Sequence, residues 1–181
     1  LLWFAETVNG GNTAISAVLT ANINLTGKEW SGIGTSDYPF AGSFDGQNKT
    51  VTFDNAANGL FAYVLGTAEQ RAEIKNVITA GSINAINAAT SGVAAIAGRA
   101  QLANISNCTN YASVQNTANY TAGIVGHVTY NYGAVTVSGC VNAGEIWSDF
   151  ARSGGIIGNA EPGKNSADTV IIENCCNTAK V

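Results

Sequence analysis

A spacing that recurs four times constrains the fold of this chain more than any other feature. In the last copy, "VIIENCCNTAKV", Cys175 follows Ile172 by three residues and precedes Val181 by six. The same offsets recur around Cys140, Cys108 and Val77. Successive copies are 31, 32 and 35 residues apart. A period in this range is typical of stacked repeat architectures.

A short phrase rich in small and apolar residues precedes each copy. It reads GLFA at 59–62, AIAG at 95–98, GIVG at 123–126 and GIIG at 155–158. Each repeat therefore holds three short apolar phrases, rich in Ile and Val and broken by Gly, Asn and Ser, which favours strands. The pattern predicts an all-β fold, a three-sided parallel β-helix with about 31–35 residues per coil.

One coil buries too little apolar surface to offset the conformational entropy of some thirty ordered residues, so the coils must stack. We expect a single solenoid domain over 1–181. Residues 1–11 would form a short capping helix that ends at Gly10 and Gly11. Residues 12–73 would form irregular first coils, with a strand at 18–27 buried on one face, and 74–181 the regular coils.

The recurrent cysteine position predicts an internal column. Val77, Cys108, Cys140 and Cys175 would lie above one another, roughly 4.8 Å apart, as an inward-facing ladder. Buried cysteine often acts as a small hydrophobe, although a disulfide between neighbouring rungs is an alternative. Zinc is disfavoured because no Cys-x-x-Cys pair and only one His is present. Cys176 would point away from the column and be the most reactive thiol.

Asparagine flanks the ladder on both sides. Asn110, Asn142 and Asn177 stand two residues after it, and Asn76, Asn107 and Asn174 stand one residue before it. Because Asn tolerates left-handed backbone and can hydrogen-bond locally, these positions predict stacked corners. Ligand binding by Asn110, Asn142 and Asn177 is the alternative.

The Gly phrases at 59–62, 123–126 and 155–158, followed by "IKNV", "VSGC" and "IENC", resemble the bacterial GLUG repeat. The run "LTANINLTG … FAGSFDGQNKTVTF" resembles it as well. The resemblance covers nearly the whole chain. It implies a right-handed parallel β-helix from a large secreted or surface-attached bacterial protein, such as an adhesin. It says little about activity.

Composition excludes several classes of function. Apolar residues make up 46% of the chain and charged residues 11%, with a net charge of −4 and no basic stripe, which argues against nucleic-acid binding. No apolar run reaches the roughly 20 residues that cross a bilayer. No signal for a cofactor or a metal is present, so we expect neither.

The spacing between each Gly phrase and the ladder varies most, so insertions collect on one edge, often the binding edge of a solenoid. His127, Tyr130, Asn131 and Tyr132 lie there, and exposed tyrosines suit sugars or proteins. The alternative is that these tyrosines simply pack over the edge.

Enzyme candidates are sparse, and we assign no catalytic residue. Asp45 is explained by an Asp-Gly turn, Asp37 lies in an ordinary loop, and Glu145 and Glu173 should face solvent. A lyase would need a base beside a cation, but Arg99, Arg152 and His127 belong to different phrases.

The sequence therefore predicts a non-catalytic module of an extracellular or bacterial surface protein, a stalk or adhesive surface that binds glycan or a host or bacterial surface protein. The alternative is a fragment of a carbohydrate-active β-helix enzyme, either a polysaccharide lyase or a glycoside hydrolase. Val181 occupies the last position of the repeated spacing. We therefore expect adjacent repeats or end-to-end self-association at the C-terminal coil.

Overall fold

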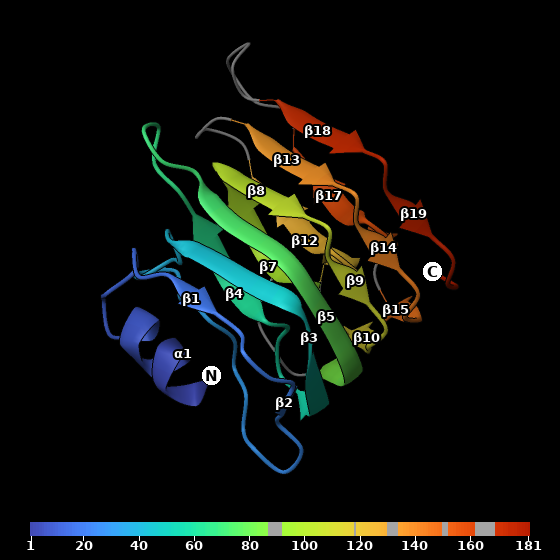
Figure 1. Cartoon of the computed structure of the whole chain (residues 1–181). Coiled ribbons are helices and arrows are strands. Elements are labelled where there is room, and N and C mark those ends of the chain that lie inside the picture. Colours follow the sequence, from blue (N-terminus) through green and yellow to red (C-terminus); the bar gives the residue numbers. More distant parts are fainter. Residues whose placement is uncertain (87–91, 118, 130–133, 150–151, 162–168) are drawn as a thin grey trace.

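The computed structural model describes residues 1–86, 92–117, 119–129, 134–149, 152–161 and 169–181. In these ranges the chain is an all-β parallel solenoid of about five turns with one short N-terminal helix, which confirms the predicted fold class. The coils follow one another along the solenoid from the helix at one end to the C-terminus at the other (Figure 1).

The strands of the described ranges belong to three sheets. The largest has twelve strands: β1 (Ala17–Val18), β2 (Ile23–Asn24), β3 (Ser43–Ala56), β5 (Ala72–Ala85), β8 (Ala103–Ser106), β9 (Thr109–Asn110), β10 (Ser113–Asn116), β13 (Val135–Ser138), β14 (Val141–Asn142), β15 (Ile146–Ser148), β18 (Val170–Glu173) and β19 (Cys176–Asn177). A second sheet has the order β17 (Ile157–Ala160), β12 (Val125–Val128), β7 (Ala97–Gln101), β4 (Phe61–Leu65). The third has the order β16 (Ser153–Gly154), β11 (Thr121–Ala122), β6 (Val93–Ala94).

The strand register follows the sequence template. Ile105 pairs with Ile74 on one side and with Val137 on the other, and Val137 pairs in turn with Ile172. The Gly phrases pair in the same way, since Ala97 lies opposite both Phe61 and Val125. The phrases GLFA and AIAG, which depart from the Gly-x-x-Gly pattern, therefore keep the common register. Each repeat of the sequence is one coil.

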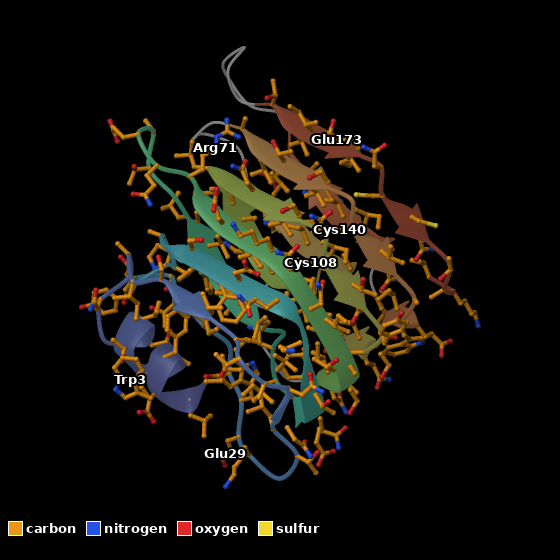
Figure 2. All side chains as sticks on the ribbon, in the orientation of Figure 1. Trp3, Glu29, Arg71, Cys108, Cys140 and Glu173 are labelled. Carbon is orange, nitrogen blue, oxygen red and sulfur yellow. The ribbon has the colours of Figure 1, made fainter. Side chains whose placement is uncertain are left out.

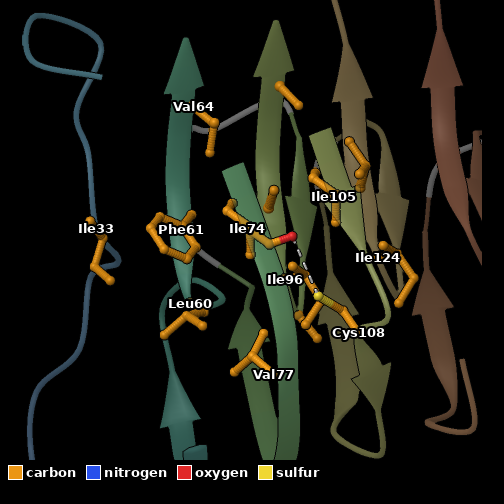
Figure 3. Close-up of a cluster of buried hydrophobic side chains, with 14 of the residues drawn as sticks. Ile33, Leu60, Phe61, Val64, Ile74, Val77, Ile96, Ile105, Cys108 and Ile124 are labelled. Carbon is orange, nitrogen blue, oxygen red and sulfur yellow. Dashed lines mark hydrogen bonds between the residues drawn. The ribbon is translucent and has the colours of Figure 1, made fainter. Parts of the chain in front are cut away.

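The inward side chains of these strands form one hydrophobic core (Figure 3). Leu60, Ile96 and Ile124 are fully buried, as are Ile74 and Ile105. Burial of such a side chain stabilises the fold by about 1.5–3 kcal/mol. The core is continuous from coil to coil, so each coil depends on its neighbours for stability.

A sharp bend precedes each ladder position. Asn76, Asn107 and Asn174 have φ angles of 53°, 53° and 54°, and Gly139 takes this place in the third copy with a φ of 60°. This left-handed backbone favours Asn and Gly over other residues. The bends separate β8 from β9, β13 from β14 and β18 from β19.

The helix α1 (Leu2–Asn9) packs against the first coils. Phe4, Ala5 and Val8 are buried, and the Phe4 ring lies 6.0 Å from the Phe40 ring and 5.9 Å from the Phe44 ring. These contacts place aromatic surface over the core at this end of the solenoid. The helix thereby shields the first coil from water.

The prediction of one strand over 18–27 is wrong. Leu19 and Leu25 are buried as expected, but Ala21 is exposed, and the segment forms two short strands, β1 and β2. The neighbouring strand β3 explains the break. The pairing of β3 with β5 shifts register between Asp45 and Lys49, where two residues of β3 have left-handed backbone. A segment that pairs with β3 along its length must therefore bend at the same place.

The C-terminal coil presents core-type positions to solvent. Ile172 is 53% exposed, although its partner Val137 in the preceding coil is fully buried. Cys175 is partly buried, and β18 and β19 are edge strands of the large sheet. An exposed edge of this kind can pair with another strand.

Candidate functional site

The ladder cysteines lie inside the solenoid. Cys108 and Cys140, both labelled in Figure 2, are fully buried, and the Cys108 Sγ lies 3.9 Å from the carbonyl oxygen of Ile74 in the preceding coil. The Cys140 and Cys175 sulfurs lie 3.8 and 3.5 Å from the matching carbonyls of Ile105 and Val137. All four cysteines are free thiols. Burial raises the pKa of Cys108 well above its usual range, so this thiol is a core group rather than a nucleophile.

The stacked asparagines form a second internal ladder. Thr79 donates to Asn110 over 2.9 Å, Asn110 donates to Asn142 over 2.8 Å, and Asn142 donates to Asn177 over 2.7 Å. The other amide hydrogen of each Asn goes to the carbonyl two residues on, of Ala112, Gly144 and Ala179. Because Asn110 and Asn142 are fully buried and their amide donors are used in this way, we assign them a structural role.

The asparagine ladder also accounts for the first glycine of two Gly phrases. A Cβ atom at Gly123 would collide with the side chain of Asn142, and one at Gly155 would collide with Asn177. At these two places the Gly phrase and the asparagine of the ladder are packed closely against each other.

The second sheet carries a row of polar and aromatic side chains on the side away from the core. Tyr63, Arg99, His127 and Asn159 follow the four Gly phrases directly, and the strand register places them next to one another on β4, β7, β12 and β17. We call these four residues the outer row. Adjacent members are one strand apart, roughly 4.8 Å.

His127 is the most enclosed member of the outer row, with 5% of its surface exposed. Its ring stacks on Tyr120 at a centroid distance of 4.3 Å. Its Nε2 lies 3.1 Å from Oε1 of Glu161, which is an ion pair only when the imidazole is protonated, and the two atoms lack the alignment of a hydrogen bond. Arg152 lies over the ring of Tyr120 and donates to its hydroxyl over 3.2 Å.

Burial is the main influence on His127 and lowers the pKa of its imidazole. The carboxylate of Glu161 opposes this effect, while the positive charges of Arg99 and Arg152 lower the pKa further. The imidazole is therefore neutral at pH 7. Arg99 lies opposite His127 on the neighbouring strand, and Arg152 donates to the hydroxyl of Tyr120, which stacks on the imidazole.

His127 lies within β12 and packs against Tyr120. Arg99, Arg152 and His127 belong to different phrases, but the fold brings them near one another: Arg99 is the strand neighbour of His127, and Arg152 hydrogen-bonds Tyr120. Tyr130, Asn131 and Tyr132 lie outside the described residues. Sequence reasoning missed Tyr63 and Tyr120, although Tyr63 could have been found as the residue after the first Gly phrase.

A cavity of about 200 Å³ adjoins the outer row at β4 and β7. Its lining includes Ser36, Pro39, Tyr63, Leu65, Arg99 and Gln101. The guanidinium of Arg99 lies over the Tyr63 ring, 5.4 Å from its centroid. A larger hollow of about 680 Å³ lies between α1 and residues 27–32, and the side chains of Glu6, Glu29 and Asp54 help to line it.

The other candidate carboxylates do not form a catalytic pair. Asp45 accepts the Gln47 N–H over 2.9 Å and an Asn76 amide hydrogen over 3.1 Å, and these bonds lower its pKa. Asp45 therefore serves as the hydrogen-bond acceptor that holds the turn at Gly46 and Gln47. Glu145 and Glu173 are exposed. Within the described ranges no three His, Cys, Asp or Glu side chains are grouped to hold a metal, and no helix is long and apolar enough to span a membrane.

Comparison with known proteins supports the fold alone. No family model and no curated protein matches the chain. A crystal structure from Bacteroides ovatus, described as a "putative immunoglobulin A1 protease", is similar with a TM-score of 0.62 and 19% sequence identity. The match covers 96% of this chain and 72% of that one.

Proposed function

We propose that this chain is a non-catalytic β-helix module of an extracellular or surface-attached bacterial protein, related to the GLUG-repeat proteins, and that it binds a glycan along the outer row. The register of Tyr63, Arg99, His127 and Asn159 across four coils carries this proposal. Tyr63 and Arg99 are partly exposed, whereas His127 is buried against Tyr120, so Tyr63 offers the ring surface of this row to a ligand. A polymer laid along the rigid second sheet could contact these side chains. The rest of the solenoid serves as the stalk that holds this surface.

The binding test compares two aromatic side chains on different sheets. The protein is applied to a glycan array together with the variants Tyr63→Ala and Trp147→Ala. Tyr63 lies in the outer row, whereas Trp147 is exposed on β15 of the largest sheet. We expect Tyr63→Ala to weaken glycan binding at least tenfold and Trp147→Ala to leave it unchanged. Equal loss in both variants would place the binding surface elsewhere.

A protein ligand is the other outcome of this test. The name of the similar Bacteroides ovatus protein refers to immunoglobulin A1, so immunoglobulin A1 belongs in the same experiment as an immobilised ligand. Binding to immunoglobulin with no binding to any glycan would refute the glycan proposal and favour an adhesive surface for proteins.

A polysaccharide lyase is the second candidate, and the surroundings of His127 favour it. A neutral imidazole can accept a proton, and a neighbouring guanidinium can neutralise a substrate carboxylate. Against it, His127 is covered by Tyr120 and only 5% exposed, which leaves its ring little access to a substrate. Release of unsaturated sugars from acidic polysaccharides, lost in His127→Gln, would establish the lyase and overturn the non-catalytic proposal.

A further inference from the structure

The C-terminal end of the solenoid exposes side chains at positions that the preceding coil buries. Ile172 is 53% exposed, and the other inward apolar residues of this coil are only partly buried: Ile156, Ile157, Val170 and Cys175. The matching side chains of the preceding coil are fully buried: Ile124, Val125, Val135, Val137 and Cys140. We call the exposed set, together with Asn177, the end face. We propose that the end face is a docking surface for one further parallel coil of the same repeat type.

This inference goes beyond glycan binding, because the end face is a different surface from the outer row. Apolar surface gathered beside the unpaired edges of strands is typical of a site of protein association. The contact between one coil and the next is already established along the solenoid, and the end face continues it. Since each coil is stabilised by its neighbours, a docked coil would be stabilised in the same way.

The fold argues against a second copy of this chain as the occupant. At the opposite end α1 packs over the first coils through Phe4, Ala5 and Val8, so a second copy has no matching open coil there to present (Figure 1). Two C-terminal ends related by a two-fold axis could pair the same strand with itself only in antiparallel fashion. The strand pairs between the last two coils are all parallel.

The hydrogen bonds between coils show how the docked coil would bind. The N–H of Ala143 donates to the carbonyl of Asn110 over 2.8 Å. One coil further on, the N–H of Thr178 donates to the carbonyl of Asn142 over 2.9 Å. In the same register, the docked coil would donate to the carbonyl of Asn177. Its strands would lie beside β18 and β19 and extend the largest sheet by strand addition.

The asparagine ladder specifies one side chain of the docked coil. Asn142 uses its amide hydrogens for the carbonyl of Gly144 and for the side-chain oxygen of Asn177. Asn177 gives one amide hydrogen to the carbonyl of Ala179 and lies exposed at the end of the ladder. A further rung would receive the other hydrogen, as Asn177 receives that of Asn142. The docked coil should therefore carry Asn, or another side chain with an acceptor oxygen, at this position.

The test supplies the coil as a peptide. The probe has the sequence of residues 134–149 with Cys140→Ala, which prevents a disulfide, and it matches the last coil in the spacing of its inward residues. A control peptide also carries Asn142→Leu. We expect the probe to bind the protein and the control to bind about fivefold more weakly or worse, because Leu would cover the Asn177 amide without accepting its hydrogen.

Two neighbouring isoleucines of β18 provide matched variants of the protein. Ile172→Lys places a charge on the end face, where a docked coil would bury it. Ile171→Lys adds the same charge one residue away, on the opposite side of the strand, where Ile171 is 44% exposed. We expect Ile172→Lys to weaken binding of the probe at least tenfold and Ile171→Lys to leave it within twofold of the parent.

Three results would overturn the inference: no binding of the probe, equal binding of the two peptides, or equal loss in the two variants. Self-association of the unaltered protein that is lost in Ile172→Lys, with no binding of the probe, would identify a second copy as the occupant instead. The comparison of the two peptides uses the unaltered protein, so it decides the matter even if Ile172→Lys fails to fold.

Discussion

The asparagine ladder should be a major source of stability, and Asn142→Ala tests this directly. Asn142 donates to Asn177 and to the Gly144 carbonyl and accepts a hydrogen bond from Asn110. Truncation would leave the Asn110 donor and the Gly144 carbonyl buried without partners. At about 1–3 kcal/mol for each unsatisfied group, the free energy of unfolding should fall by about 2–6 kcal/mol.

Urea denaturation measures this change, and Asn177→Ala provides the matched control. Asn177 is exposed, so water can replace the hydrogen bonds that its side chain makes. We expect Asn177→Ala to lower stability by less than about 1 kcal/mol, with an unchanged dependence on urea concentration in both variants. A loss below about 1 kcal/mol in Asn142→Ala, or equal losses in the two variants, would refute the reasoning.

Three further predictions follow from the core and the histidine. Because burial lowers the pKa of His127 from its usual 6.5, the unfolded chain binds the proton more readily, so stability should fall as the pH drops below about 6.5, and His127→Gln should remove this part of the pH dependence in unfolding curves. In a thiol-labelling assay Cys176 should react quickly in the folded protein, whereas Cys108 and Cys140 should react only on unfolding; fast labelling of either would contradict their burial. Replacement of the capping residue, Phe4→Ala, should cost about 3–5 kcal/mol in denaturant unfolding, and a cost below about 1 kcal/mol would show that α1 does not support the first coils.

The repeat made the architecture predictable from the sequence. The offsets from Ile105 through Cys108 to Val114 fix which side chains face inward, and a register slip of one residue would turn them outward. The left-handed bends at Asn76, Asn107 and Asn174 were predictable for the same reason, because few residues other than Asn and Gly adopt that backbone. The break between β1 and β2 was not predictable, since it depends on the shape of β3.

The candidate site was harder to predict because it depends on contacts between coils. Tyr120 precedes β11 and His127 lies on β12, so a turn of the chain separates them. The repeat spacing does not predict that this turn brings the two rings to a centroid distance of 4.3 Å. Arg152 reaches Tyr120 from the following coil. The sequence therefore showed which residues follow each Gly phrase, but not that Arg99 and Arg152 both lower the pKa of the same imidazole.

The most direct test of the proposed binding surface is an amide NMR titration with the glycan that binds most tightly on the array. We expect the chemical-shift changes to gather along the second sheet, at Tyr63, Arg99 and Gln101. Changes confined to the twelve-stranded sheet, or gathered at the hollow beside α1, would contradict it.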